Sequence, residues 1–473
     1  MSKVNSMKKP VYSLSLAVFL AACSFVPDYE QPTVALEQQW IKTALDEQTT
    51  ATASDLGWRE YFRDPQLQTL IAAALQHNHD LKQAALTVER AAAQYGIAEK
   101  NELPVIALNS EVNRAGNVRG AETNYRVGVG FSNFELDFFG RVRAMTTAAL
   151  NHYLQTREAR DSAQLAVIQG VAKTYYAARI NQALMDLSKQ VVQSRQKSAE
   201  LARLQYQAGV INETILHGYE SAIAAAEANY HGYRRSYQQA LNGLSSLVGM
   251  PYQQLNVPAA GGLDQAFSAL TVPAGLPSAL LEKRPDVRAA EYALKAANAN
   301  IGAARAALFP KISLTGSLGY LSTELDHLLD EPHRAWSITP AVMLPIFDRG
   351  LLNAQVKVSE LNQKIVVEEY QKTLQTAFQE IADILIARET YAEQYQAAQK
   401  AATAQNEVLR LEKLRFNTGV SDGLALLEAE RNSFQTQERV LQVQLGLLTN
   451  LVSFYTAMGG GLQEYGAQLP DIK

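Results

Sequence analysis

Apolar side chains recur at alternating intervals of three and four residues in two windows of the chain. The first window holds Leu81, Ala84, Val88, Ala91 and Tyr95, and the second holds Val287, Ala290, Leu294, Ala297 and Ile301. This spacing predicts helices that pack through a coiled-coil seam of alternating large and small residues. The first helical signal begins after Pro65 and runs to about Lys100, whereas residues 24–62 are predicted to be irregular.

A pattern with a period of two follows each of these helices. Apolar positions alternate with small or polar ones in four segments, at 106–113, 125–132, 312–318 and 336–344. The alternation predicts four strands of about ten residues, the length that a tilted, lipid-facing strand needs. Four strands cannot close a membrane barrel, because the smallest has about eight, but a trimer would supply twelve. Two soluble hairpins that cap a helical bundle are the alternative interpretation.

Two long segments, 140–207 and 351–417, contain no strong break in their helical pattern. At a rise of 1.5 Å per residue, each would extend about 100 Å, roughly twice the width of a compact domain of this size. A Gly-Val pair follows each segment. Returning helices are predicted beyond these pairs, at 213–248 and 423–457.

The second half of the chain repeats the first. Residues 79–104 reappear 206 positions later at 285–310, and residues 203–210 match 413–420 at an offset of 210. Self-similarity at a nearly fixed offset predicts two tandem structural repeats. The predicted divisions are a signal peptide at 1–22, a lipidated segment at 23–63, a first repeat at 64–251, a linker at 252–275, a second repeat at 276–461 and a tail at 462–473.

The amino terminus resembles a bacterial lipoprotein signal. Three lysines precede an apolar stretch at 11–22, which is too short to span a bilayer as a mature helix, and Leu20-Ala-Ala-Cys23 follows. Cleavage before Cys23 and acylation of that residue, the only cysteine, are therefore expected, and Ser24 favours sorting to the outer membrane. An ordinary signal peptide with an incidental cysteine is the alternative. No other segment has 18 uninterrupted apolar residues, so no transmembrane helix is predicted in the mature chain.

The charge and the motifs of the chain argue against several functions. Its net charge is −4, and removal of the first 22 residues, with three lysines and no acid, makes it three units more negative. A mildly acidic chain with no run of basic residues gives no indication of a nucleic-acid binding surface. The sequence has no Gly-x-x-x-x-Gly-Lys-Ser/Thr, His-Glu-x-x-His or Gly-x-Ser-x-Gly motif. We therefore expect no enzyme activity, no cofactor and no metal.

Several phrases together resemble the TolC-like outer membrane factors, in particular the lipoprotein branch that serves efflux pumps of the resistance-nodulation-division type. Besides the lipoprotein signal, they are Leu56-Gly-Trp58, Tyr61-Phe-x-Asp-Pro65, Glu135-Leu-Asp-Phe-Phe-Gly-Arg141, Arg284-Pro-Asp-Val-Arg-Ala-Ala-Glu291, Ala299-Asn-Ile-Gly-Ala-Ala-Arg305, Leu344-Pro-Ile-Phe347 and Leu426-Leu-Glu-Ala-Glu-Arg431. They cover the chain from residue 20 to about 461.

The resemblance implies a mainly α fold with membrane β structure. Three chains would form a twelve-stranded outer membrane β-barrel that continues as a long periplasmic α-helical barrel. It also implies a periplasmic membrane-fusion adaptor and an inner membrane pump as partners, with outer membrane lipid around the barrel. The implied function is passive conduction of drugs and other small toxic compounds out of a Gram-negative cell.

The resemblance also suggests residues for a periplasmic gate and for contact with the adaptor. The family pattern Leu-x-x-Leu-Asp-Ala reads here as Leu424-Ala-Leu-Leu-Glu428-Ala429, which puts an apolar ring at Leu424 and a cation-favouring ring at Glu428, on one helix face. A solvated helix surface is the alternative for this pair. The expected adaptor-facing tips comprise Gln207, Gly209, Val210, Arg415, Asn417, Gly419 and Val420, although a chain reversal alone also explains both glycines.

Two other functions fit parts of the pattern. A protein-secretion duct would have the same fold, but the lipoprotein signal and the Leu426-Leu-Glu-Ala phrase favour drug efflux. A periplasmic coiled-coil lipoprotein scaffold without a pore would explain Cys23 and the helices but leave the four strands unexplained.

Overall fold

The computed structural model describes residues 24–34, 57–118, 120–255, 284–460 and 462. Cys23, the predicted signal peptide, most of the predicted linker and most of the tail lie outside the described residues. The chain divides into two compact units, described separately below. We call residues 1–34, 86–158 and 288–373 the sheet unit, and residues 35–85, 159–287 and 374–473 the hairpin unit.

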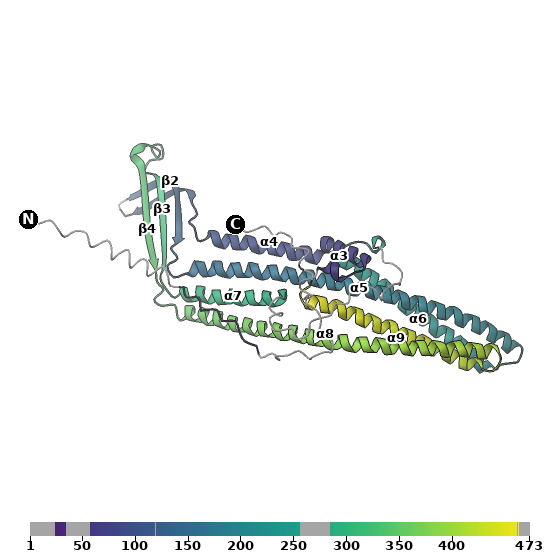
Figure 1. Ribbon diagram of the computed structural model, residues 1–473. Coiled ribbons are helices and arrows are strands. Elements are labelled where there is room, and N and C mark those ends of the chain that lie inside the picture. Colours follow the sequence, from purple (N-terminus) through teal and green to yellow (C-terminus); the bar gives the residue numbers. More distant parts are fainter. Residues whose placement is uncertain (1–23, 35–56, 119, 256–283, 461, 463–473) are drawn as a thin grey trace, which may run out of the picture. The chain divides into compact units, whose positions relative to one another are not determined.

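The two halves of the chain have the same order of long elements (Figure 1). In the first half these are α4 (His79–Lys100), β1 (Ala107–Asn117), β2 (Gly120–Glu135), α5 (Arg141–Gln207) and α6 (Glu213–Val248). In the second half they are α7 (Pro285–Ala306), β3 (Lys311–Ser322), β4 (Arg334–Met343), α8 (Leu351–Asn417) and α9 (Gly423–Ala457). Helices α5 and α8 have 67 residues each, and all four long and returning helices match their predicted ranges to within a residue.

The predicted single helix from Pro65 to Lys100 is wrong, because the chain breaks at Asn78. Helix α3 (Pro65–His77) ends there and α4 begins. Asn78 accepts a hydrogen bond from the Leu81 backbone N–H at 2.9 Å, which caps the new helix, and donates to the Leu247 carbonyl at 2.8 Å. The short helix α2 (Trp58–Tyr61) also lies in a segment predicted to be irregular. Two 3₁₀ turns, Tyr252–Gln254 and Glu331–His333, are the remaining elements of the described part of the chain.

The four strands form one antiparallel sheet in the order β1-β2-β3-β4, so β1 and β4 are its edges. The predicted length of about ten residues holds for β4 with 10, but β2 has 16. Pairing aligns Leu108, Val129, Leu318 and Trp336 in one row across the sheet. All four are at least 49% exposed, so one face of the sheet is an uncovered apolar surface.

The opposite face of the sheet carries small and polar residues. The neighbouring row is Asn109, Gly128, Gly319 and Ala335. The strands approach closely here, since a Cβ atom on Gly319 would lie 2.1 Å from the Val127 carbonyl oxygen and one on Gly128 would lie 2.6 Å from that of Leu318. The predicted alternation of faces is confirmed, and glycine is required where the backbones come together.

Four helical segments of the sheet unit form a layer in the order α4-α5-α7-α8 (Figure 1). Thr146 of α5 donates to the Ala98 carbonyl of α4 at 3.2 Å, Arg288 of α7 pairs with Glu158 of α5 at 2.8 Å, and Arg305 of α7 pairs with Glu360 of α8 at 2.9 Å. Each helix adjoins one strand along the chain: α4 precedes β1, α5 follows β2, α7 precedes β3 and α8 follows β4. The helical layer therefore repeats the order of the sheet.

In the core of the hairpin unit, aromatic side chains near residue 61 pack against the end of α9. Tyr61 stacks on Tyr455 with ring centroids 4.2 Å apart, and its hydroxyl donates to the Leu451 carbonyl at 2.6 Å. Beside it, the Asp64 carboxylate caps α3 and accepts from Arg179 at 2.8 Å and from Tyr175 at 2.7 Å. These contacts attach α3 to α5.

Helix α9 is the one described helix that is long and apolar enough to cross a membrane, by length and composition alone. Half of its most apolar window is buried inside the protein. Val452, Phe454 and Tyr455 are each at most 2% exposed within the hairpin unit. Core helices commonly meet the same criterion, and the burial of α9 indicates that it is one.

Candidate functional site

The two predicted tips have the same backbone geometry. Gly209 and Gly419 adopt φ angles of +71° and +74°, in the left-handed region that favours glycine. The N–H of Val210 donates to the Gln205 carbonyl at 2.8 Å, and the N–H of Val420 donates to the Arg415 carbonyl at 2.9 Å. These bonds close the ends of α5 and α8 as glycine C-caps. The reversal of the chain thus accounts for both glycines.

Side-chain caps begin the returning helices at equivalent positions. Asn212 accepts from the Ile215 N–H at 3.1 Å, and Asp422 accepts from the Ala425 N–H at 2.9 Å. All seven residues predicted to face the adaptor are exposed. At the second tip, Glu412 contacts Arg415 at 3.2 Å and accepts from the Ser421 hydroxyl at 2.6 Å, so one carboxylate bridges the two sides of the turn.

The first tip carries a charged cluster around Glu220. His217 Nδ1 lies 2.9 Å from Glu220 Oε2, and Arg203 of α5 lies 3.4 Å from Oε1 of the same carboxylate. The hydrogen bond to Glu220 raises the pKa of His217 above its ordinary value, and the same contact lowers the pKa of Glu220. Sequence reasoning did not identify this cluster, although a His and a Glu three residues apart on a helix signal such a contact.

We expect Glu220→Gln to lower the pKa of His217 toward its ordinary value of about 6.5. Because the pKa of His217 is raised, the pair stabilises the folded tip below pH of about 6.5, and this contribution is lost as pH rises through the raised pKa. Because the pKa of Glu220 is lowered, its contribution is present above pH of about 4.3 and is lost as pH falls through the lowered pKa. Histidine-selective NMR titration measures the change.

Glu213→Gln is the matched control for this titration. Glu213 lies 3.7 Å from His217 Nε2, farther than Glu220, so its replacement should shift the pKa of His217 less. Equal shifts in the two variants would contradict the assignment of Glu220 as the main partner.

The predicted gate residues lie in the first turns of α9. Leu424 is 68% exposed, and the Glu428 side chain is 63% exposed and lies 3.4 Å from Arg431. Both side chains are therefore accessible to solvent in a single chain. The ion pair with Arg431 was not anticipated from the sequence.

Contacts that sequence reasoning missed connect α9 to the first hairpin at positions that adjoin the gate residues in the sequence. Tyr219 of α6 is buried with Ala199 and Ala202 of α5, and Leu427 of α9 packs against this cluster. The position of Gly423, the first residue of α9, leaves no room for a side chain, because an added Cβ atom would lie 2.0 Å from the Tyr219 hydroxyl oxygen. We call Tyr219, Gly423 and Leu427 the clasp.

Polar contacts extend the connection along α9. Ser194 of α5 donates to Glu430 at 2.9 Å, and Tyr233 of α6 donates to Glu438. The nearby Arg195 is buried and donates to the Ala222 carbonyl at 2.6 Å. Burial lowers the pKa of Arg195, and the negative charge of Glu430 opposes that change. No short sequence motif signals these contacts, because their partners are separated by up to 236 residues.

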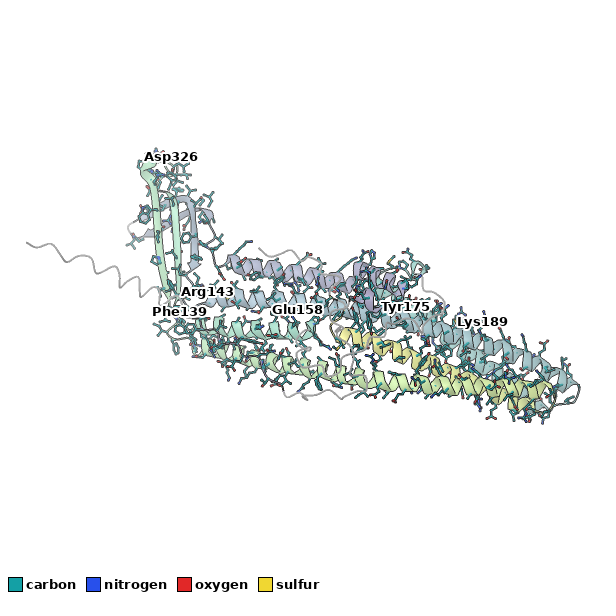
Figure 2. All side chains as sticks on the ribbon, in the orientation of Figure 1. Phe139, Arg143, Glu158, Tyr175, Lys189 and Asp326 are labelled. Atoms are coloured by element: carbon teal, nitrogen blue, oxygen red, sulfur yellow. The ribbon has the colours of Figure 1, made fainter. Side chains whose placement is uncertain are left out.

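Three potential metal ligands meet in the connection between β3 and β4. Ligand atoms of Glu324, Asp326 and His327 lie within 4.8 Å of one another, and all three residues are exposed. Figure 2 shows Asp326 at the end of the sheet opposite to Phe139. His327 already pairs with Asp330 at 3.0 Å, and exposed acidic groups of this kind are common without an ion, so no metal role is assigned.

Two features define the class of protein. The first is a sheet with unpaired edge strands and one exposed apolar face, and the second is a pair of long helical hairpins. This arrangement is that of a subunit of a membrane channel, in which strands face lipid and helices extend the conduit.

The chain belongs to the outer membrane efflux protein family, whose sequence profile matches residues 70–250 and 276–460. It is 38% identical to a probable efflux pump outer membrane protein of Pseudomonas putida, TtgC, with 98% of each chain covered. It is 35% identical to the outer membrane protein OprJ of Pseudomonas aeruginosa, with 97% of this chain and 98% of OprJ covered.

A solved structure has the same fold. The open-state MtrE outer membrane channel of Neisseria gonorrhoeae is 40% identical, with a TM-score of 0.85 over 93% of this chain and 99% of MtrE. The predicted family, the efflux channel function and the location in the outer membrane are confirmed.

Proposed function

We propose that three copies of this chain form a passive efflux duct, with a twelve-stranded barrel in the outer membrane and an α-helical barrel in the periplasm. The observation that carries the proposal is the four-stranded sheet with two open edges and one exposed apolar face. In lipid, each unpaired backbone group would cost several kcal/mol, so the edges must be paired. Edge strands β1 and β4 have 11 and 10 residues, so β4 of one copy can pair with β1 of the next along nearly their full length.

The segment after Cys23 supports the proposed lipid anchor. Phe25 stacks on Phe309 with centroids 4.3 Å apart, and Asn298 donates to the Pro27 carbonyl at 2.7 Å. Phe309 lies just before β3, and Phe139 just before α5, where Figure 2 shows it beside the ends of the strands. Acyl chains on Cys23 would start next to the base of the sheet, where they can enter the surrounding lipid.

The tips and the gate complete the proposed duct. Exposed tip residues, including Val210 and Val420, are available to a periplasmic adaptor, and an inner membrane pump of the resistance-nodulation-division type would supply substrate and energy. Rings of Leu424 and Glu428 would narrow the periplasmic mouth, and the acidic ring would favour cations. The duct itself would move drugs and other small toxic compounds without catalysis.

Planar bilayers containing the purified protein test this function. We expect the detergent-extracted particle to have the mass of three chains and to form pores, and we expect the double substitution of Leu424 and Glu428 by Ala to raise single-channel conductance several-fold. Removal of the side chains widens the constriction and weakens the preference for cations. A monomeric particle without pores would refute the duct, and pores with unchanged conductance would refute the gate.

Glu407 and Leu411 of α8 provide the matched control. They are also four residues apart and exposed, and Glu407 pairs with Arg410 three residues on, as Glu428 pairs with Arg431. Replacing both with Ala removes the same chemical groups outside the proposed gate. Conductance should stay at the wild-type value.

A further inference from the structure

We propose that the polar face of the sheet carries a binding site for small aromatic carboxylates with a ring hydroxyl group, such as para-hydroxybenzoate. The site is a hollow of about 120 Å³, which we call the polar-face hollow. The lining residues that we assign to ligand binding are Arg126, Gly128, Ser317, Gly319, Ala335 and Ser337. The proposal rests on the proposed duct, whose bore this face would line, and it names a class of compound that the wall would recognise.

The register of the sheet places the polar groups of the hollow on opposite sides of its floor. Side chains two residues apart on a strand share a face of the sheet. Arg126 precedes Gly128 by two residues on β2, and Ser317 precedes Gly319 by two residues on the antiparallel β3. Because Gly128 pairs with Gly319, Arg126 and Ser317 lie on the same face, each about 7 Å from the glycine row and on opposite sides of it.

The floor of the hollow consists largely of peptide groups. Gly128 and Gly319 have no side chains, and glycine within a strand allows a ligand to approach the backbone closely. A flat ring can therefore lie on this floor, with the exposed side chain of Leu321 as an apolar edge in the row of Arg126. The volume suits a single six-membered ring, since a closed cavity of about 150 Å³ holds benzene.

The charge of the lining favours an anion over a cation. Arg126 is exposed, and it is the one charged side chain among the described residues that line the hollow. Glu111 is its partner in the register of β1 and β2, but the two side chains form no ion pair in the described part of the chain. A guanidinium presents paired N–H donors that match the two oxygens of a carboxylate. The carboxylate of the ligand is therefore assigned to Arg126.

A pair of serines supplies the second polar contact. Ser317 Oγ and Ser337 Oγ lie 2.8 Å apart, so one hydroxyl donates to the other. This bond uses one of the two hydroxyl protons, and the second proton can be donated to a ligand. A ring hydroxyl opposite the carboxylate would meet this pair while the carboxylate binds Arg126. Benzoate, which lacks the hydroxyl, should therefore bind more weakly than para-hydroxybenzoate.

Weak binding at such a site is compatible with transport. A conduit needs sites that a solute can enter but also leave readily. The guanidinium of Arg126 is exposed, and the ring would contact the hollow on one side only, so the ligand should exchange rapidly. Three hollows around the bore would raise the local concentration of aromatic carboxylates without trapping them.

Saturation-transfer difference NMR with para-hydroxybenzoate and the detergent-extracted, full-length protein tests the hollow. Arg126→Gln should weaken binding about tenfold, because it removes a charge-assisted pair of hydrogen bonds. Ala335→Leu should also weaken binding, because it fills the floor without changing the charge. Arg114→Gln is the matched control. Arg114 lies six residues from Leu108 on β1 and hence on the apolar face, so its replacement should leave binding unchanged.

The outcomes separate the hollow from the duct. The neutral para-hydroxybenzamide should bind about tenfold more weakly than the acid, and equal binding of the two would overturn the role of Arg126. Unchanged binding in Arg126→Gln, or an equal loss in Arg114→Gln, overturns the site, and a pore-forming particle of three chains then leaves the duct intact. A monomeric particle without pores refutes the duct, and the assignment of the hollow to a bore falls with it. Because the two substitutions in the hollow change charge and shape independently, either one alone decides if the other fails to fold.

Discussion

Replacing Asp64 with Ala is expected to reduce the stability of the protein by about 3–5 kcal/mol, because it leaves the buried Arg179 without its carboxylate. The side chains of Arg179 and Asp64 are only 5% and 10% exposed. The substitution also removes the hydrogen bond from Tyr175 and the cap of α3. Thermal unfolding followed by circular dichroism should show a large decrease in the transition midpoint.

Two further variants separate the ion pair from the cap. Asp64→Asn keeps an oxygen that can cap α3 but removes the charge. It should therefore still show most of the loss of stability expected for Asp64→Ala. Adding Arg179→Met to Asp64→Asn removes the buried charge as well and should restore part of the loss, since replacing both partners is far less costly than removing one. If the double variant is no more stable than Asp64→Asn, the ion pair does not account for the effect.

Replacing Gly423 with Ala should weaken the attachment of α9 to the first hairpin and increase single-channel conductance. The new methyl group would overlap the hydroxyl of Tyr219, a residue of a buried cluster, so the contact between Tyr219 and the first residue of α9 must open. Overpacking of this kind typically costs about 1–3 kcal/mol. Because Leu424 is the next residue, the displacement would reach the proposed gate directly. Bilayer recordings and thermal unfolding measure the two effects.

Tyr219→Phe provides the matched rescue. Combined with Gly423→Ala, it removes the oxygen atom that the methyl group meets at 2.0 Å and leaves the ring carbon at 3.1 Å, a contact that a small shift can relieve. The double variant should recover most of the wild-type conductance and stability. Persistence of the full effect would show that the clasp is not responsible.

Local signals predicted the long elements of the fold. Gly209 and Gly419 end α5 and α8 through left-handed caps. The ends of these helices could be predicted because a glycine at such a position is a local signal for a helix C-cap. Strand faces were predictable for the same reason, since alternation is a property of neighbouring residues. In the structure, α6 and α9 begin directly after the side-chain caps at Asn212 and Asp422.

Contacts between distant residues were not predictable in this way. The break at Asn78 interrupts a continuous apolar pattern, and its side chain is held by Leu247, which lies 169 residues away. The clasp depends on a glycine and a tyrosine from different hairpins, and neither has a distinctive local context. The predicted gate residues themselves rest on the family resemblance, and their conducting role awaits the bilayer measurement proposed above.

The close approach of β2 and β3 affects what a transported molecule would meet. At Gly128 and Gly319 the polar face presents peptide groups, and the neighbouring carbonyl oxygens leave no room for even a methyl group. In the proposed barrel this face lines the bore. At this row, cargo would therefore pass a stretch of wall in which peptide groups of the two central strands, rather than their side chains, set the chemistry.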